Sequence, residues 1–320
     1  MNVRRRLIPG IAAVAATALG LGALTACSGS ASADARNGGK LDVVASFYPL
    51  QYLAEQIGGS RVSVTNLTRP GQEPHDLEIS ARETARLQDA DVALYLKNLQ
   101  PAVDDAVAQS GVRTRIDAAA LTTLEKHGNE VGGHAAAHDH SEGEDTGAAD
   151  PHVWLDPVRF GQVAEGVSAA LKKADPKHAA DYDRNMAALR KKFTALDEDF
   201  RDGLAHTRTK TFITTHAAFG YLAERYGLTE EAVNGLDPES EPSANRVKGL
   251  ENLAKADGVT TVFYETLVSD RTAGTIARDL GLRTDVLDPL EGITDKSRGS
   301  DYMQVMRSNL KALQTALGTK

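Results

Sequence analysis

The sequence predicts an α/β protein of two lobes, each built on a parallel β-sheet with flanking helices and joined to the other by one long helix. Short β-branched, apolar runs alternate with helical segments between residues 41 and 117, and the same alternation returns between residues 211 and 287. Strand–helix alternation at this spacing is typical of parallel βαβ units. Between the two regions, residues 176–204 have an unbroken amphipathic pattern.

The first 26 residues have the layout of a secretory signal peptide. Arg4, Arg5 and Arg6 precede an apolar stretch over residues 8–24. The following Leu-Thr-Ala-Cys resembles a bacterial lipobox, so we expect Cys27 to be acylated and to become the N-terminus of the mature chain. The Ser-, Ala- and Gly-rich residues 27–40 then predict a flexible tether to the membrane. The alternative is an ordinary signal peptide that is cleaved after Ala26.

Composition narrows the class of protein further. The chain has 36 basic and 44 acidic residues, and removal of the three signal arginines leaves a net charge of −11. This excess argues against nucleic-acid binding and favours attraction of cations. Cys27 is the only cysteine, so no internal disulfide can form and a packed core must stabilise the fold.

Residues 41–175 are expected to form the N-terminal lobe. Strands are predicted at residues 41–48, 62–67, 92–95 and near 115–116, and helices at residues 49–57, 80–88, 101–109 and 157–173. Ser80 and Glu83 have the spacing of a capping box at the start of the second helix.

A histidine-rich loop over residues 127–150 interrupts this pattern. His127, His134, His138 and His140 lie there among Gly, Ala, Asp and Glu, with almost no large apolar residue. This composition predicts a surface loop that binds metal weakly. A low-complexity insert that arose by chance remains the alternative.

Residues 176–204 are expected to be the linking helix, and residues 205–320 the C-terminal lobe. An apolar stripe at spacings of three and four runs along the linking helix: Tyr182, Met186, Leu189, Phe193, Leu196 and Phe200. Strands of the second lobe are predicted at residues 211–215, 259–264 and 284–287.

Three histidines lie at or near strand-to-helix turns: His75, His152 and His216. Ligands of open α/β sheets bind at the carboxyl ends of the strands, so the three imidazoles could converge on one zinc ion. Asp288, which follows the last predicted strand, is the candidate fourth ligand. Each histidine alone is more often a structural residue, and Asp288 alone could be a turn residue before Pro289.

Three segments, residues 71–78 (GQEPHDLE), 150–157 (DPHVWLDP) and 215–222 (THAAFGYL), resemble the three histidine motifs of the zinc/manganese ABC-transporter solute-binding proteins, cluster A-I. The resemblance runs from about residue 40 to residue 320. It implies a metal site in the cleft between the lobes, with His75 and His152 from the first lobe and His216 and Asp288 from the second. Manganese-type relatives tend to carry a carboxylate in place of His216, so the histidine here favours zinc. Some zinc relatives carry Glu where this chain has Pro74, and that ligand is not carried over.

The resemblance implies an extracytoplasmic, lipid-anchored protein, not an enzyme, that carries Zn²⁺ as cargo to an ABC permease and its ATPase. We expect it to be monomeric. A manganese-binding protein, a metal-dependent adhesin or a metallochaperone of the same fold is the alternative. A zinc hydrolase is disfavoured, because a fourth protein ligand would close the position that a catalytic water needs.

Two further carboxylates are expected to support the ligand histidines or to lie in the cleft beside them, rather than to bind the metal. Asp156 lies four residues after His152, and Glu265 follows a predicted strand. A ligand histidine usually donates its other N–H to a carboxylate or carbonyl. The alternative is that both only cap helices or contact solvent.

Overall fold

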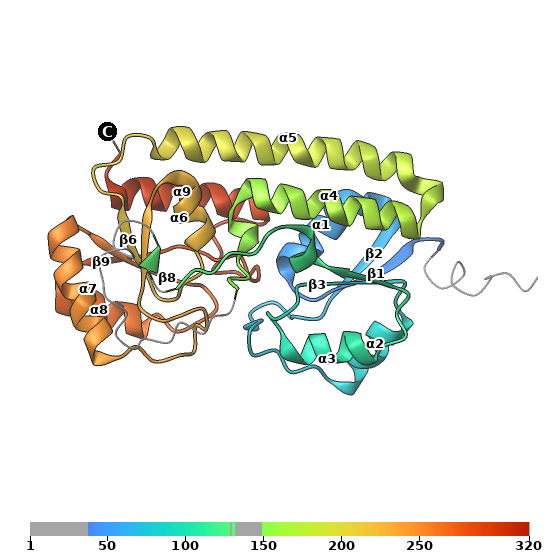
Figure 1. Cartoon of the computed structure of the whole chain (residues 1–320), viewed down its shortest axis with the longest axis horizontal. Coiled ribbons are helices and arrows are strands. Elements are labelled where there is room, and N and C mark those ends of the chain that lie inside the picture. The colour runs from blue at the N-terminus through green and yellow to red at the C-terminus, as the bar shows by residue number, and fades with distance from the viewer. Residues whose placement is uncertain (1–37, 129, 132–148, 320) are drawn as a thin grey trace, which may run out of the picture.

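The structure, a computed structural model, describes residues 38–128, 130–131 and 149–319. The signal peptide, Cys27, His134, His138 and His140 lie outside the described residues. The described chain folds into two α/β lobes beneath a shared layer of helices (Figure 1). Two sheets, one parallel and one parallel except for β5 (Glu130–Val131), with flanking helices confirm the predicted α/β fold class.

The first lobe contains a four-stranded parallel sheet in the order β2-β1-β3-β4. Its strands are β1 (Leu41–Ala45), β2 (Val62–Asn66), β3 (Val92–Tyr95) and β4 (Thr114–Asp117). Val43 of β1 pairs with Val64 on one side and Val92 on the other. The helices of this lobe are α1 (Tyr48–Gly58), α2 (Ala81–Asp89) and α3 (Pro101–Gln109). Successive side chains of β1 point to opposite faces of the sheet and pack in two different cores. Val44 packs in the cluster that α2 and α3 cover, and Val43 packs in the cluster that contains α1.

The second lobe contains a five-stranded sheet in the order β5-β7-β6-β8-β9. Its parallel strands are β6 (Thr211–Thr214), β7 (Thr229–Ala232), β8 (Thr261–Tyr264) and β9 (Arg283–Val286), and β5 (Glu130–Val131) joins β7 antiparallel. The helices of this lobe are α6 (Gly220–Tyr226), α7 (Ala244–Asp257), α8 (Arg271–Leu280) and α9 (Tyr302–Leu317).

Two strands of the second sheet were not expected from the sequence. β7 has the sequence TEEA, yet all four residues are buried. Glu230 accepts a hydrogen bond from Thr214 Oγ1, and Glu231 pairs with Arg246. β5 also shows that the chain reaches the second sheet before residue 150, although residues 41–175 were expected to belong to the first lobe.

The long helix lies along both lobes. α5 (Ala179–Leu204) packs beside α4 (Pro157–Ala174), α1 and α9 (Figure 1). The predicted apolar stripe of α5 is buried. Phe160, Phe193 and Tyr302 contact one another with ring centroids 5.0–5.8 Å apart, so one apolar cluster continues from the first lobe into the second. Short 3₁₀ turns complete the described elements: Gly59–Arg61, Ala118–Leu121, Val153–Leu155 and Pro176–His178.

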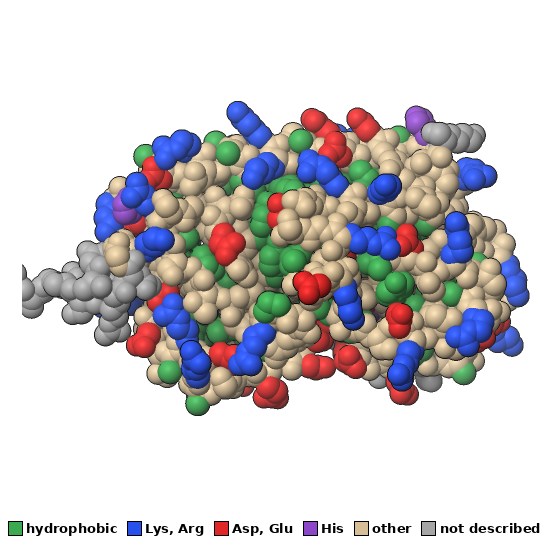
Figure 2. All heavy atoms as spheres, turned by 180° about the vertical axis from the view of Figure 1, so that it is seen from behind, with side chains coloured by type: hydrophobic (Ala, Val, Ile, Leu, Met, Phe, Trp, Pro, Cys, Tyr) green, Lys and Arg blue, Asp and Glu red, His purple; other side chains and the backbone are tan. Residues whose placement is uncertain are grey.

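The surface is mixed in charge. On the face shown in Figure 2, lysines and arginines are interspersed with aspartates and glutamates. Among the residues that the structure describes, no helix is both long enough and apolar enough to span a membrane.

Candidate metal centre

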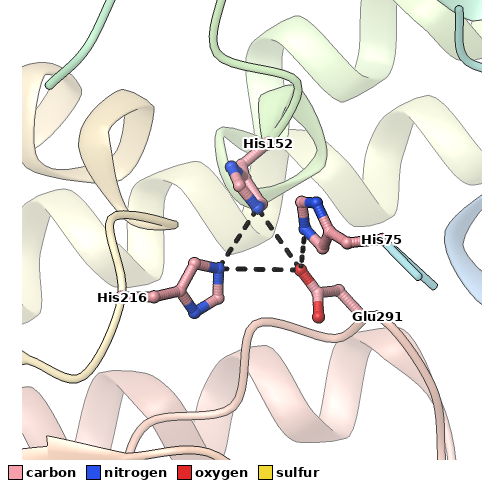
Figure 3. A group of neighbouring side chains, drawn as sticks. All are labelled: His75, His152, His216 and Glu291. Carbon is pink, nitrogen blue, oxygen red and sulfur yellow. Dashed lines mark hydrogen bonds and ion pairs between the residues drawn. The ribbon is translucent and has the colours of Figure 1, made fainter. Parts of the chain in front are cut away.

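Four side chains from distant parts of the chain point toward one another (Figure 3): His75, His152, His216 and Glu291. Each offers a ligand atom within 4.8 Å of the other three. We call this group the primary site. The side chains of His152, His216 and Glu291 are fully buried, and that of His75 is 13% exposed. His75 is therefore the member of the group that solvent reaches.

The two lobes contribute different members of the primary site. His75 lies in the connection between β2 and α2, where its backbone N–H donates to Glu73 Oε1. His216 follows β6, and Glu291 follows β9. β6 and β8 are the strands between which the order of the second sheet reverses, the place where open α/β sheets bind ligands. His152 begins the 3₁₀ turn that leads into α4.

The distances fit a tetrahedral ion. Glu291 Oε1 lies 3.2 Å from His75 Nε2, 3.3 Å from His152 Nε2 and 3.8 Å from His216 Nε2. His216 Nε2 and His152 Nε2 are 3.4 Å apart. Zinc with ligands at about 2.0–2.1 Å requires ligand atoms about 3.3 Å from one another in a tetrahedron. The four donors are thus already arranged around a position that zinc could take.

Two carboxylates orient the buried imidazoles. Asp150 Oδ1 lies 2.7 Å from His152 Nδ1 and also accepts from the His152 backbone N–H. Glu265 Oε1 lies 2.6 Å from His216 Nδ1. With Nδ1–H donated to a carboxylate, the lone pair of each ring is on Nε2, which faces the centre of the group.

The electrostatics of the group favour a cation at its centre. Burial alone would lower the pKa of His152, but the hydrogen bonds with Asp150 and Glu291 outweigh it and raise that pKa to about 10. The pKa of His216 is also raised, because the charge of Glu265 outweighs burial. Burial would raise the pKa of Glu291, but its contacts with His152 and His75 hold it below its ordinary value. Zinc binding at neutral pH would therefore displace a proton from His152.

One buried oxygen of the group lacks a partner. Glu291 Oε2 has no hydrogen-bond partner within the described part of the chain. An unpaired carboxylate oxygen costs free energy when buried, and a metal ion would compensate it. The donor set of three imidazole nitrogens and one carboxylate suits zinc better than manganese.

Asp288, the expected fourth ligand, is not part of the primary site. Its Oδ1 accepts from the Leu290 backbone N–H at 2.8 Å, and its Oδ2 accepts from Thr266 Oγ1 at 3.3 Å. Asn309 binds both backbone groups of Asp288. These bonds build the turn that leads to Glu291, with Leu290 at a φ of 62°. Asp288 thus shapes the turn, and Glu291 provides the carboxylate.

Asp156 does not contact a histidine of the group. The turn after His152 carries its carboxylate to the start of α4, where it accepts from the backbone N–H groups of Val158 and Arg159. It also forms an ion pair of 3.2 Å with Arg225. Asp156 therefore caps a helix, which is the alternative that the sequence left open, and the aspartate that contacts His152 is Asp150. Of the four loop histidines, His127 is described, and its Nδ1 lies 2.7 Å from Asp150 Oδ2.

Glu291 and Asp150 were missed as candidates. Asp150 stands two residues before His152 inside the second histidine motif, a spacing that allows an aspartate to bond both the ring and the backbone of the histidine. Glu291 carried no such signal, because it reaches the group only through the turn at Asp288.

The amino-acid sequence is similar to those of known zinc-binding proteins. A family model described as the periplasmic zinc-uptake complex component A matches residues 43–316. The zinc-binding lipoprotein AdcA of Streptococcus pneumoniae is 38% identical over 297 residues, which cover 91% of this chain and 58% of AdcA. The chain thus spans little more than half the length of that relative. The high-affinity zinc uptake system protein ZnuA of Bacillus subtilis is 34% identical over 320 residues, which cover 97% of this chain and 98% of ZnuA.

Solved structures show the same likeness. The Zn(II)-bound ZnuA-like domain of S. pneumoniae AdcA matches with a TM-score of 0.71 and 34% identity, covering 87% of this chain and 99% of the domain. The laminin-binding protein Lmb of Streptococcus agalactiae, described as an adhesin with metal-transporting activity, matches with a TM-score of 0.75 and 30% identity, over 87% of this chain and 99% of Lmb.

Proposed function

We propose, from the premise that this chain belongs to the zinc-uptake complex component A family, that it captures zinc outside the cytoplasm for import. The observation that carries the proposal is the convergence of three Nε2 atoms on Glu291 Oε1 at 3.2–3.8 Å. The zinc ligands in this proposal are His75, His152, His216 and Glu291.

The ligand set supports a binding role. Members of this family are solute-binding transport proteins. Four protein ligands fill a tetrahedral shell and leave no coordination position for the water that a zinc hydrolase activates. Similarity to Lmb supports the same metal chemistry, and the adhesive activity belongs to that protein.

The cellular setting follows from the N-terminus and the relatives. Relatives of the chain are named as lipoproteins and as periplasmic components, which supports an extracytoplasmic location. The lipobox-like sequence supports a lipid anchor at Cys27, so that a monomer tethered to the membrane delivers zinc to an ABC permease and its ATPase. The partner proteins would take the ion from the side where His75 is exposed.

The first test compares three substitutions by competition titration of zinc against a chelator. His216→Ala removes a nitrogen ligand and is expected to weaken zinc binding by several orders of magnitude. Glu291→Gln removes the proposed fourth ligand, and Asp288→Asn alters only the turn beside it. Glu291→Gln should therefore weaken binding more than Asp288→Asn. Unchanged affinity in His216→Ala would refute the site, and the reverse order of the two acidic variants would restore Asp288 as the ligand.

The histidine-rich loop has a separate proposed role. His134, His138 and His140 would bind zinc more weakly than the primary site, whose four ligands already face one position. Zinc collected by these three histidines would raise the supply to the primary site. Removal of residues 132–148 is expected to abolish the weak binding by these three histidines, preserve tight binding in the primary site and slow uptake when zinc is scarce. Loss of tight binding would instead make the loop part of the site.

A further inference from the structure

A second group of possible ligands lies on the other side of Asp150 from the primary site. Glu125, His127 and Glu224 each offer a ligand atom within 4.8 Å of the other two. His127 Nε2 lies 3.8 Å from Glu125 Oε2 and 3.6 Å from Glu224 Oε2. Glu224 belongs to α6, while Glu125 and His127 lie in the chain that approaches β5. A nitrogen and two carboxylates from separate segments therefore face one another.

His127 is held in one orientation. Its side chain is only 9% exposed, and its Nδ1 lies 2.7 Å from Asp150 Oδ2. Its ring packs edge-on against Tyr221, with centroids 4.5 Å apart. Gly220 leaves the space that the ring needs, because a Cβ there would come within 2.6 Å of His127 Nδ1. A histidine fixed by a carboxylate at Nδ1, with Nε2 aimed at other donors, is the usual arrangement of a metal ligand.

The backbone around Glu125 is equally fixed. Tyr221 Oη accepts from the Glu125 backbone N–H and donates to the Asp150 carbonyl, both at 2.8 Å. The Asp150 backbone N–H donates to the Glu125 carbonyl at 2.8 Å. Arg159 pairs with Glu125 Oε1, so that Glu125 Oε2 faces His127. Arg159 Nη2 also lies 3.9 Å from Glu224 Oε2. Arg159 offsets part of the negative charge, so an ion held here would bind more weakly than in the primary site.

We infer that Glu125, His127 and Glu224 form a second zinc site, open to solvent, which we call the outer site. Glu224 has 52% of its side chain exposed, so an ion can enter directly from water. Three protein ligands leave a fourth position for a water molecule. Asp150 joins the two sites, because its Oδ2 contacts His127 and its Oδ1 contacts His152. The inference does not depend on what the primary site carries.

The outer site can be tested in the full mature chain by calorimetric zinc titration. His134, His138 and His140 are first replaced by Ala, so that other loop imidazoles do not bind. This background is expected to take up one tightly bound zinc and one weakly bound zinc. Adding Glu224→Gln keeps the shape of the side chain but removes a ligand charge, and should weaken the second zinc at least about tenfold. Glu165→Gln on α4 is the matched control, since it neutralises an exposed carboxylate paired with Arg190.

Each outcome separates the outer site from the proposed function. A second zinc that is lost with Glu224→Gln and kept with Glu165→Gln supports the outer site. A background that binds a single zinc, or a second zinc unaffected by Glu224→Gln, would overturn it and leave His127 as a structural anchor for the loop. Absence of the tight zinc with the weak one retained would count against the primary site alone.

Discussion

Asp150 and Asp156 are both buried and both lie within four residues of His152, but only Asp150 contacts its imidazole. Asp150→Asn keeps an oxygen acceptor but removes the charge that orients His152. Loss of such a partner typically costs 10–100-fold in metal affinity, roughly the change we expect in a zinc competition titration. Asp156→Asn keeps a residue that caps α4 well and should leave zinc affinity unchanged. Equal losses in the two variants would show that Asp150 acts only through stability.

Glu230, which is not one of the proposed zinc ligands, predicts a pH dependence of the folding stability. Burial raises its pKa from 4.5 to about 7, although Thr214 and the Phe219 backbone N–H donate to it. As the pH rises, Glu230 therefore loses its proton at a lower pH in the unfolded chain than in the folded chain. The free energy of unfolding should fall between about pH 4.5 and 7, by about 3 kcal/mol from this group, and the loss should be complete above pH 7.

The Glu230→Gln variant isolates that contribution. Denaturant unfolding of the zinc-free protein at pH 5 and pH 8 should show the variant gaining stability relative to the parent as the pH rises. The exposed Glu165→Gln control should show no such gain. A constant difference between Glu230→Gln and the parent at both pH values would mean that Glu230 is ionised in the fold throughout this range.

At the scale of elements, the strands that could be predicted from the sequence are those with an apolar or β-branched pattern. β1, β3 and β6 are β-branched or apolar runs, and the predicted strands contain them. β7 was missed because its two glutamates are buried through contacts made only in the folded chain. Glu291 was missed for a similar reason, since its position depends on a turn with Leu290 in the left-handed region, which no local pattern of the sequence reveals.

The capping box of α2 is an element that the sequence did predict. Ser80 accepts from the Glu83 backbone N–H, and Glu83 accepts from the Ser80 backbone N–H at 2.7 Å. Ser80→Ala is expected to lower the free energy of unfolding by about 1 kcal/mol, because a helix N–H loses its acceptor. Ser60→Ala, on the exposed turn Gly59–Arg61, is the comparison in thermal or denaturant unfolding. An equal effect of the two substitutions would argue that the cap contributes nothing beyond a surface serine.

At the scale of the whole molecule, two kinds of contact join the lobes. The apolar cluster of α1, α4, α5 and α9 is continuous. Around the primary site, Trp154 Nε1 donates to the Pro289 carbonyl at 2.7 Å, and Tyr302 Oη donates to the Trp154 carbonyl at 2.6 Å. These bonds fix the segment of His152 against the turn of Glu291. His152 and Glu291 are thus held in place before zinc arrives. His75 is the ligand that comes from a connection of the first sheet.

Zinc bound to all four ligands should therefore stabilise both lobes together. At a free zinc concentration a thousand times the dissociation constant, binding should add about 4 kcal/mol to the free energy of unfolding. Hydrogen exchange should slow on zinc addition in the segment around His75 as well as around His216 and Glu291. His75→Ala should abolish the slowing in the first lobe while a weaker effect persists in the second. Slowing confined to the second lobe in the parent protein would mean that His75 does not bind the ion and that zinc does not bridge the lobes.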